Sequence, residues 1–143
     1  MHAVVITGAS KGFGKAIAKA IAGSLEAQVH FVLSGRNLLE LNEVRHEVYR
    51  LRHEHKLAVS CDIVIGDCSN LLELETIADG LFGAANLFKH STSLASITFF
   101  NNAGSLGTLC SVGSPHNNVT DISATLNLNV TACMYLTSEF VRR

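Results

Sequence analysis

Hydrophobic and polar positions along the chain follow two alternating patterns. Short apolar runs such as "HAVVITG" at residues 2–8 are rich in β-branched residues, and they predict strands that are buried on both faces of a parallel sheet. Between these runs, longer segments repeat apolar residues every three or four positions, with charged residues between them. In residues 37–56 this stripe consists of Leu38, Leu41, Val44, Val48 and Leu51. Such segments predict amphipathic helices.

The alternation extends over the whole sequence. Strands are predicted at residues 2–8, 28–35, 57–67 and 95–104. Helices are predicted at residues 14–27, 37–56 and 70–88, the last broken at Gly80 or Gly83, and from about Val119 to the end. Strands that alternate with helices form βαβ units, so we expect an α/β fold with a doubly wound parallel sheet and helices on both faces. Since no repeat or linker interrupts the pattern, residues 1–143 are predicted to form one domain.

The composition narrows the classes of function. The 143 residues include 11 basic and 12 acidic side chains, for a formal charge of -1, so we expect no binding to nucleic acid or to an anionic membrane surface. The sequence shows no signal-peptide pattern and no apolar segment long enough to cross a bilayer, which predicts a cytoplasmic protein. Histidines cluster within residues 46–55, but a solvated helix face explains them better than a metal site. Buried, reduced thiols are expected at Cys61, Cys68, Cys110 and Cys133.

Three glycines follow the first predicted strand and open the first predicted helix. Gly8 permits a tight turn, Gly12 lets the backbone approach a pyrophosphate closely, and Gly14 allows the helix to pack tightly on the sheet. Unpaired amides at the start of this helix, together with the helix dipole, would bind an anion. An ordinary strand–helix turn is the alternative, but the position of the glycines at the first βα junction favours a dinucleotide site.

The residues after the second predicted strand indicate which dinucleotide binds. NAD-binding sites usually carry an acidic residue there, whereas this chain has Arg36 and no carboxylate before Glu40. A guanidinium suits a 2′-phosphate, and Lys11 offers a second cation, although both could be solvated surface residues. We therefore expect NADP(H) rather than NAD(H). Asp67 ends the third predicted strand, where it could accept the adenine amino group or cap the next helix, a task that Ser69 could also perform.

These motifs resemble those of the short-chain dehydrogenase/reductase family. "TGASKGFG" at Thr7–Gly14 is similar to the family's glycine loop, "GD" at residues 66–67 to its aspartate after strand three, and "NNAG" at Asn101–Gly104 to its motif after strand four. The resemblance covers the whole chain, and it implies a Rossmann-like sheet with strand order 3-2-1-4. It also implies an NADP-dependent oxidoreductase that forms a homodimer when complete. Within the family, the chain most resembles reductases that act on the side-chain ketones of pterins, which implies a small pterin-like carbonyl substrate.

The resemblance also implies a role for each matching residue. Ser10 and Lys11 would lie near the adenosine phosphate, Arg36 and Asn37 at the 2′-phosphate and ribose, and Asp67 and Cys68 in the adenine pocket. Asn129, on the last predicted helix, matches the family's catalytic asparagine, although it could simply be a polar residue on a helix face. The remaining cofactor-binding residues implied by the resemblance are Gly8, Ala9, Gly12, Phe13, Gly14, Asn102, Ala103 and Gly104.

The catalytic serine, tyrosine and lysine of the family have no counterparts in this chain. Tyr49 is followed four residues later by His53, and Tyr135 by Glu139, so neither forms the family's Tyr-x-x-x-Lys pair. We therefore expect an incomplete domain, truncated after the fourth helix and inactive alone, whose fourth strand is an open apolar edge at Phe99 and Phe100. A non-catalytic form that binds NADP or pairs with a longer subunit is the alternative. A third hypothesis is that the isolated chain is not a stable product.

Overall fold

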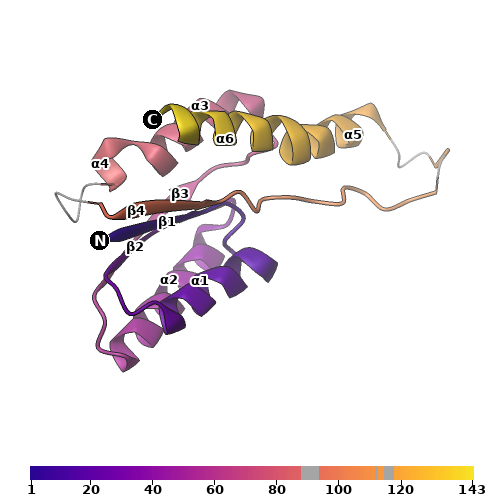
Figure 1. Ribbon diagram of the computed structural model, residues 1–143. Helices are drawn as coiled ribbons and strands as arrows, with labels where there is room; N and C mark the ends of the chain where they lie inside the picture. The colour runs from indigo at the N-terminus through magenta and orange to yellow at the C-terminus, as the bar shows by residue number, and fades with distance from the viewer. Residues whose placement is uncertain (88–93, 112, 115–117) are drawn as a thin grey trace.

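A parallel sheet divides the molecule into two layers of helices (Figure 1). The computed structural model describes residues 1–87, 94–111, 113–114 and 118–143. In these residues, four strands are ordered β3-β2-β1-β4, and every neighbouring pair is parallel. Helices α1 and α2 lie on one face of the sheet, and α3, α4, α5 and α6 lie on the other. The predicted α/β fold and strand order are therefore confirmed.

The strands form where the short apolar runs predicted them. Their bounds are His2–Ile6 for β1, Val29–Gly35 for β2, Val59–Ile65 for β3 and Ser96–Phe100 for β4. β1 and β2 lie in the centre of the sheet and are buried almost throughout, as strands covered on both faces must be. Because all four strands are parallel, their carboxyl ends lie at the same end of the sheet. The candidate site lies at this end.

The first helical layer packs on one face of the central strands. Helix α1 spans Gly12–Ser24 and begins two residues earlier than predicted, and α2 spans Leu38–Glu54. Alternate strand residues such as Val4 and Phe31 point toward this layer, where they meet the apolar stripe of α2. The stripe residues Leu41, Val44 and Val48 are fully buried, so the periodicity identified this core correctly.

The second layer is more irregular. A 3₁₀ turn at Leu71–Glu73 leads into α3 (Leu74–Phe82), and the chain breaks at Gly83 before α4 (Ala84–Leu87), at one of the two predicted positions. Residue 88, the last of that predicted helix, lies outside the described residues. Next come α5 (Val119–Leu126), a π-helical turn at Asn127–Ala132, termed η2 below, and α6 (Cys133–Arg142). Together they form the long helix at the top of Figure 1. Arg143 anchors its end by ion pairs with Asp79 on α3 (2.7 Å) and Glu139 (2.9 Å).

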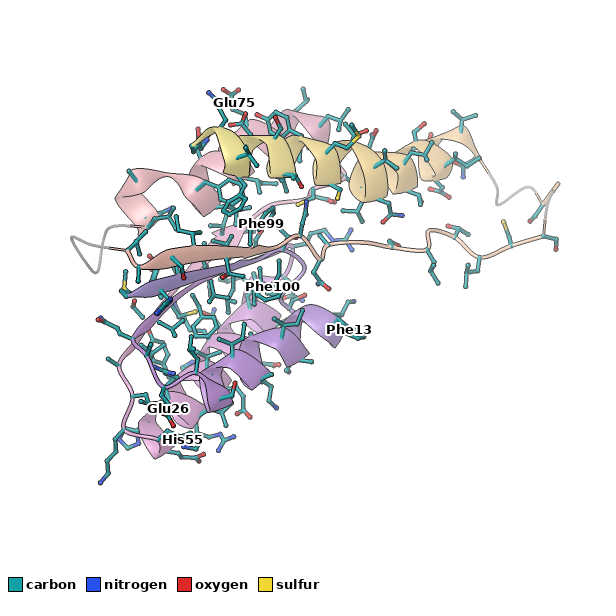
Figure 2. All side chains as sticks on the ribbon, viewed as in Figure 1. Phe13, Glu26, His55, Glu75, Phe99 and Phe100 are labelled. Atoms are coloured by element: carbon teal, nitrogen blue, oxygen red, sulfur yellow. The ribbon has the colours of Figure 1, made fainter. Side chains whose placement is uncertain are left out.

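Strand β4 forms one edge of the described sheet, but its two phenylalanines are not its open part. The side chains of Phe99 and Phe100 point to opposite faces (Figure 2) and are half-buried. The Phe99 ring lies 5.0 Å from that of Phe82 and 5.3 Å from that of Phe140, measured between centroids. The expected edge position of β4 is confirmed, but its exposed residues are Ser96–Thr98 rather than Phe99 and Phe100.

The four cysteines differ in their burial. All four thiols are free, but only Cys61 and Cys68 are buried; Cys133 is half-buried and Cys110 is exposed. The prediction of four buried thiols was therefore wrong for Cys110, which lies in an extended segment rather than in the core. None of the helices in the described part of the chain is long and apolar enough to cross a membrane.

Candidate dinucleotide site

A cavity of about 320 Å³ opens at the carboxyl ends of the strands, between the start of α1 and the segment that follows β4. Eleven of the residues that the sequence nominated for cofactor binding line it. They are Gly8, Ser10, Lys11, Gly12, Phe13, Arg36, Asp67, Cys68, Asn102, Ala103 and Gly104. This is the crevice where open α/β sheets bind ligands.

The three glycines of the first loop serve two different purposes. Gly8 adopts φ +64°, and a Cβ there would lie 2.9 Å from the Ala103 Cα. A Cβ on Gly14 would overlap the Gly8 carbonyl oxygen and come within 2.8 Å of the Asn102 Nδ2. Gly12 adopts φ +56°, but a Cβ there would have no protein atom within 4 Å. Gly8 and Gly14 therefore allow close packing inside the protein, whereas Gly12 leaves the space in front of the loop open for a ligand.

Two polar side chains fasten this loop to the end of β4. The hydroxyl of Thr7, which is fully buried, accepts hydrogen bonds from the backbone amides of Asn102 and Ala103, each at 3.0 Å. In return, the Asn102 Nδ2 donates to the carbonyl oxygens of Thr7 (3.0 Å) and Gly8 (3.3 Å). Asn102 of the "NNAG" motif thus holds the glycine loop against the end of β4. This contact gives a structural reason for an asparagine at position 102.

The start of α1 is prepared for an anion. No side chain caps the helix and its first turn contains no acidic residue, while Lys11 at the N-cap position lines the cavity. Its first amides therefore lack an intrahelical or side-chain partner and carry the positive end of the helix dipole. The side chain of Phe13 points away from the sheet at this end of the helix (Figure 2) and is 81% exposed. A pyrophosphate fits this arrangement, because it would bind the free amides in front of Gly12.

Arg36 and Asp67 form an ion pair across the mouth of the cavity. The Arg36 Nη1 lies 3.5 Å from the Asp67 Oδ2. The other oxygen of Asp67 accepts hydrogen bonds from the Ser69 amide (2.9 Å) and hydroxyl (2.7 Å). Burial raises the pKa of Asp67, but the Ser69 hydrogen bonds and the Arg36 guanidinium outweigh it, so the pKa lies below its ordinary value. Neither Asp67 nor Ser69 caps the next helical turn; the Asn70 side chain does, by accepting from the Leu72 amide.

Four of the nominated residues lie behind the cavity wall or beside it. Ala9 is fully buried and its amide donates to the Ser34 carbonyl at 2.9 Å, and Gly14 packs behind the loop. The Oδ1 of Asn37 accepts from the amides of Leu39 and Glu40 and so caps α2. Asn129 is the fourth. The assignment of Asn37 to a 2′-phosphate thus stays a prediction, and only its side-chain NH₂ group is left for that role.

Asn129 lies in the π-helical turn and is fastened to the segment after β4. Its Oδ1 accepts from the Ser105 amide (3.0 Å), and its Nδ2 donates to the Ser105 carbonyl (2.6 Å). A Cβ on Gly104 would lie 3.2 Å from the Asn129 Oδ1, so a glycine lets this contact form. π-turns inside α-helices often occur at functional sites, and this turn places the nominated catalytic asparagine beside the cavity-lining residue Gly104.

Sequence reasoning overlooked four residues of the cavity lining, which are Ser34, Gly35, Gly66 and Leu128. The first three lie at the ends of β2 and β3, so their position at the carboxyl edge was a signal that could have found them. Leu128 precedes Asn129 in the π-turn, and the sequence offered no comparable signal for it. The buried thiol of Cys68 also lines the cavity, and desolvation, together with Asp67 and Glu73, raises its pKa to about 11. It is therefore a protonated wall residue rather than a nucleophile.

Metal binding finds no support in the described residues. Within residues 1–87, 94–111, 113–114 and 118–143, no three histidine, cysteine or acidic side chains are grouped as metal ligands. In that part of the chain, the histidines of residues 46–55 form no such group.

Comparisons with known proteins agree with this geometry. A family model described as short chain dehydrogenase matches residues 2–143. The solved structure of YwfH, an NADPH-dependent reductase involved in bacilysin biosynthesis, is 21% identical and aligns with a TM-score of 0.72 over 99% of this chain and 48% of that one. Levodione reductase is 18% identical, with a TM-score of 0.72 over 99% of this chain and 48% of that one. An A-type ketoreductase of a modular polyketide synthase is 22% identical, with a TM-score of 0.68 over 98% and 27%.

At these identities the solved structures show a shared fold. The chain spans about half the length of the first two. No curated protein sequence matches it significantly.

Proposed function

The chain belongs to the short-chain dehydrogenase family, whose members are NAD(P)-dependent oxidoreductases, and from this premise we propose that it is the cofactor-binding part of an NADPH-dependent carbonyl reductase. One observation carries the choice of NADPH. A guanidinium follows the end of β2 at the mouth of the cavity, where an NAD-binding site would carry a carboxylate. Lys11 adds a second positive charge to the same cavity.

The residues would divide the dinucleotide between them. The amides at the start of α1 and the open face of Gly12 would hold the pyrophosphate, and Arg36 with Lys11 would bind the 2′-phosphate. Asp67 and Cys68 would line the adenine pocket, since both lie at the end of β3. When bound, NADPH supplies a hydride to the substrate carbonyl. The chain's own contribution is to fix the cofactor relative to the end of β4 through Thr7 and Asn102.

Asn129 would act beside the reacting groups. In the structure both ends of its amide bind the backbone of Ser105, which fixes the direction of the side chain. Its Nδ2 retains one further donor hydrogen and its Oδ1 one further lone pair, enough to hold a water molecule in a proton relay. The reaction also needs an acid that protonates the carbonyl oxygen. The 143 residues contain no Tyr-x-x-x-Lys pair that could supply it. We therefore expect these 143 residues to bind cofactor but not to reduce a carbonyl by themselves.

The substrate class rests on the finer resemblance of the sequence. The chain looks most like sepiapterin reductase, through "GFG" at residues 12–14, "LSGRN" at residues 33–37, "NNAGSLG" at residues 101–107 and "LNLNVTACMYLTS" at residues 126–138. That enzyme reduces side-chain ketones of pterins during tetrahydrobiopterin synthesis. We accordingly propose a small pterin-like ketone as the substrate, a homodimer as the complete form and the cytoplasm as the location. The polyketide ketoreductase, which shares the fold, is also named for the reduction of ketones.

Calorimetric titration of the chain with NADPH and with NADH tests the choice of cofactor. We expect NADPH to bind at least about tenfold more tightly, which corresponds to about 1.4 kcal/mol for one charge-assisted contact to the 2′-phosphate. Arg36→Met should remove most of that preference and leave NADH binding unchanged. Arg45→Met on α2, away from the cavity, is the matched control and should leave the preference intact. Equal affinities for the two nucleotides in the unmodified chain would contradict the proposal.

A further inference from the structure

We propose that Asp67 is a specificity-setting residue of the dinucleotide site, which holds Arg36 and thereby limits the preference for a 2′-phosphate. This inference rests on the proposed function, because it concerns how strongly the site distinguishes phosphorylated from unphosphorylated ribose. This role is separate from a contact with adenine. Asp67 would act through Arg36 on the ribose 2′-phosphate, which is a different part of the ligand.

The two partners of the ion pair differ in their freedom to move. The side chain of Arg36 is 68% exposed, and it also borders a neighbouring hollow of about 170 Å³, so its guanidinium has room to change direction. Asp67 is only 34% exposed and is fixed at its Oδ1 by the amide and hydroxyl of Ser69. Its backbone amide also donates to the Glu73 carboxylate at 2.9 Å. A ligand that attracts Arg36 would therefore have to draw it away from a carboxylate that cannot follow.

Asp67 and a 2′-phosphate compete for the same guanidinium, that of Arg36, at the mouth of the cavity. Arg36 and Asp67 together carry no net charge, so Asp67 offsets part of the attraction that Arg36 exerts on a 2′-phosphate. A 2′-phosphate gains the full attraction of Arg36 only when the contact at 3.5 Å to Asp67 weakens. A ribose with a free 2′-hydroxyl makes no comparable demand on Arg36. Asp67 therefore weakens binding of the phosphorylated ligand more than that of the unphosphorylated one.

Two ligands that differ only in the 2′-phosphate isolate this effect. Adenosine 2′,5′-bisphosphate and adenosine 5′-monophosphate share the adenine, so any change in an adenine contact of residue 67 cancels in the ratio of their dissociation constants. Asp67→Asn retains the shape of the side chain and an oxygen for Ser69 but removes the charge. Asp67→Ser is a second variant in case the first one folds poorly, and melting curves establish that each variant is folded. Glu26→Gln, an exposed carboxylate removed elsewhere, is the control for net charge.

The expected result is a rise of about two- to fivefold in the preference for the 2′-phosphate in Asp67→Asn, the range of a partly exposed ion pair. Glu26→Gln should leave the ratio unchanged. In an Arg36→Met background, adding Asp67→Asn should change nothing, because the effect passes through Arg36. An unchanged or lower ratio in Asp67→Asn, or an equal rise in the Arg36→Met background, would overturn the inference. If the unmodified chain shows no preference for the 2′-phosphate, the proposed function fails instead, and the inference with it.

Discussion

The loops at the two ends of the sheet differ in how their backbone polar groups are bonded. At the amino end a side chain of the protein binds them, and at the carboxyl end they face a cavity. At the amino end, the guanidinium of Arg52 is fully buried and donates to the carbonyls of Leu25, Ala27 (2.6 Å) and Ala58 (2.8 Å). These carbonyls belong to the segments that lead into β2 and β3. At the carboxyl end, the first amides of α1 have no side-chain cap and face a cavity.

The difference separates stability from function within one fold. Loop carbonyls need hydrogen-bond donors, and the two Nη groups of the buried Arg52 supply them from inside the protein, at the end where no ligand is expected. Burial lowers the pKa of Arg52, yet a guanidinium keeps its charge at neutral pH, and its planar donors suit several carbonyls at once. At the other end, polar groups that are left open to the cavity are available to a ligand. Mutations at the amino end should therefore change mainly the free energy of unfolding, and mutations at the carboxyl end should change mainly nucleotide binding.

Replacing Arg52 should produce the largest effect on stability. Arg52→Met removes a fully buried guanidinium that donates to three loop carbonyls, and we expect a loss of roughly 3–5 kcal/mol in the free energy of unfolding. Urea denaturation followed by circular dichroism measures it. Arg50→Met, on the same helix but 51% exposed, is the matched control and should cost about 1 kcal/mol or less. Similar losses for the two variants would show that Arg52 is not the anchor of the amino end.

Gly14 and Gly23 offer a smaller, paired test within helix α1. A Cβ on Gly14 would meet the Gly8 carbonyl and the Asn102 side chain, so Gly14→Ala should cost about 1–3 kcal/mol of stability and weaken nucleotide binding. A Cβ on Gly23 meets nothing within 4 Å, so Gly23→Ala should stabilise the chain by up to about 1 kcal/mol. Thermal melts combined with calorimetry separate the two outcomes. A Gly14→Ala variant as stable as the unmodified chain would mean that the loop is not packed as described.

The ionisation of Asp67 should give the smallest effect. Because its folded pKa lies below the unfolded one, its carboxylate stabilises the fold above the ordinary aspartate range, and this contribution disappears as pH falls through the folded value. At pH 7 the unmodified chain should exceed Asp67→Asn in stability by about 1 kcal/mol or less, since the pair is partly exposed. The difference should shrink toward pH 3. Urea titrations at several pH values measure it, and a difference that grows on acidification would contradict the sign.

Much of the fold could be predicted because periodicity reports burial. The apolar runs at residues 2–8 and 28–35 became the central strands, and Leu41, Val44 and Val48 of the α2 stripe became core, while Leu38 at its start is exposed. Most residues nominated through the glycine spacing and the "NNAG" motif line one cavity, because the carboxyl ends of parallel strands share one edge. These features depend on local sequence and on the topology that it implies.

Features that depend on distant partners could not be predicted in this way. The π-turn contains Asn129, whose side chain binds Ser105, 24 residues earlier in the chain. Arg52 looks like any charged residue on a helix until the loops that it reaches are placed. Asn37 was nominated for the ribose from resemblance, but its Oδ1 caps α2, a use that its position before the helix could have suggested.

We propose that the open face of the glycine loop holds the pyrophosphate of NADPH, and calorimetry of two valine variants examines this contact. Gly12 and Gly113 both adopt positive φ, and among the described residues no atom lies within 4 Å of a Cβ built at either position. Valine therefore strains the backbone similarly at each, but of the two only Gly12 lines the cavity. We expect Gly12→Val to abolish NADPH binding and Gly113→Val to preserve it, with both variants folded by circular dichroism. NADPH binding that survives Gly12→Val would contradict the account.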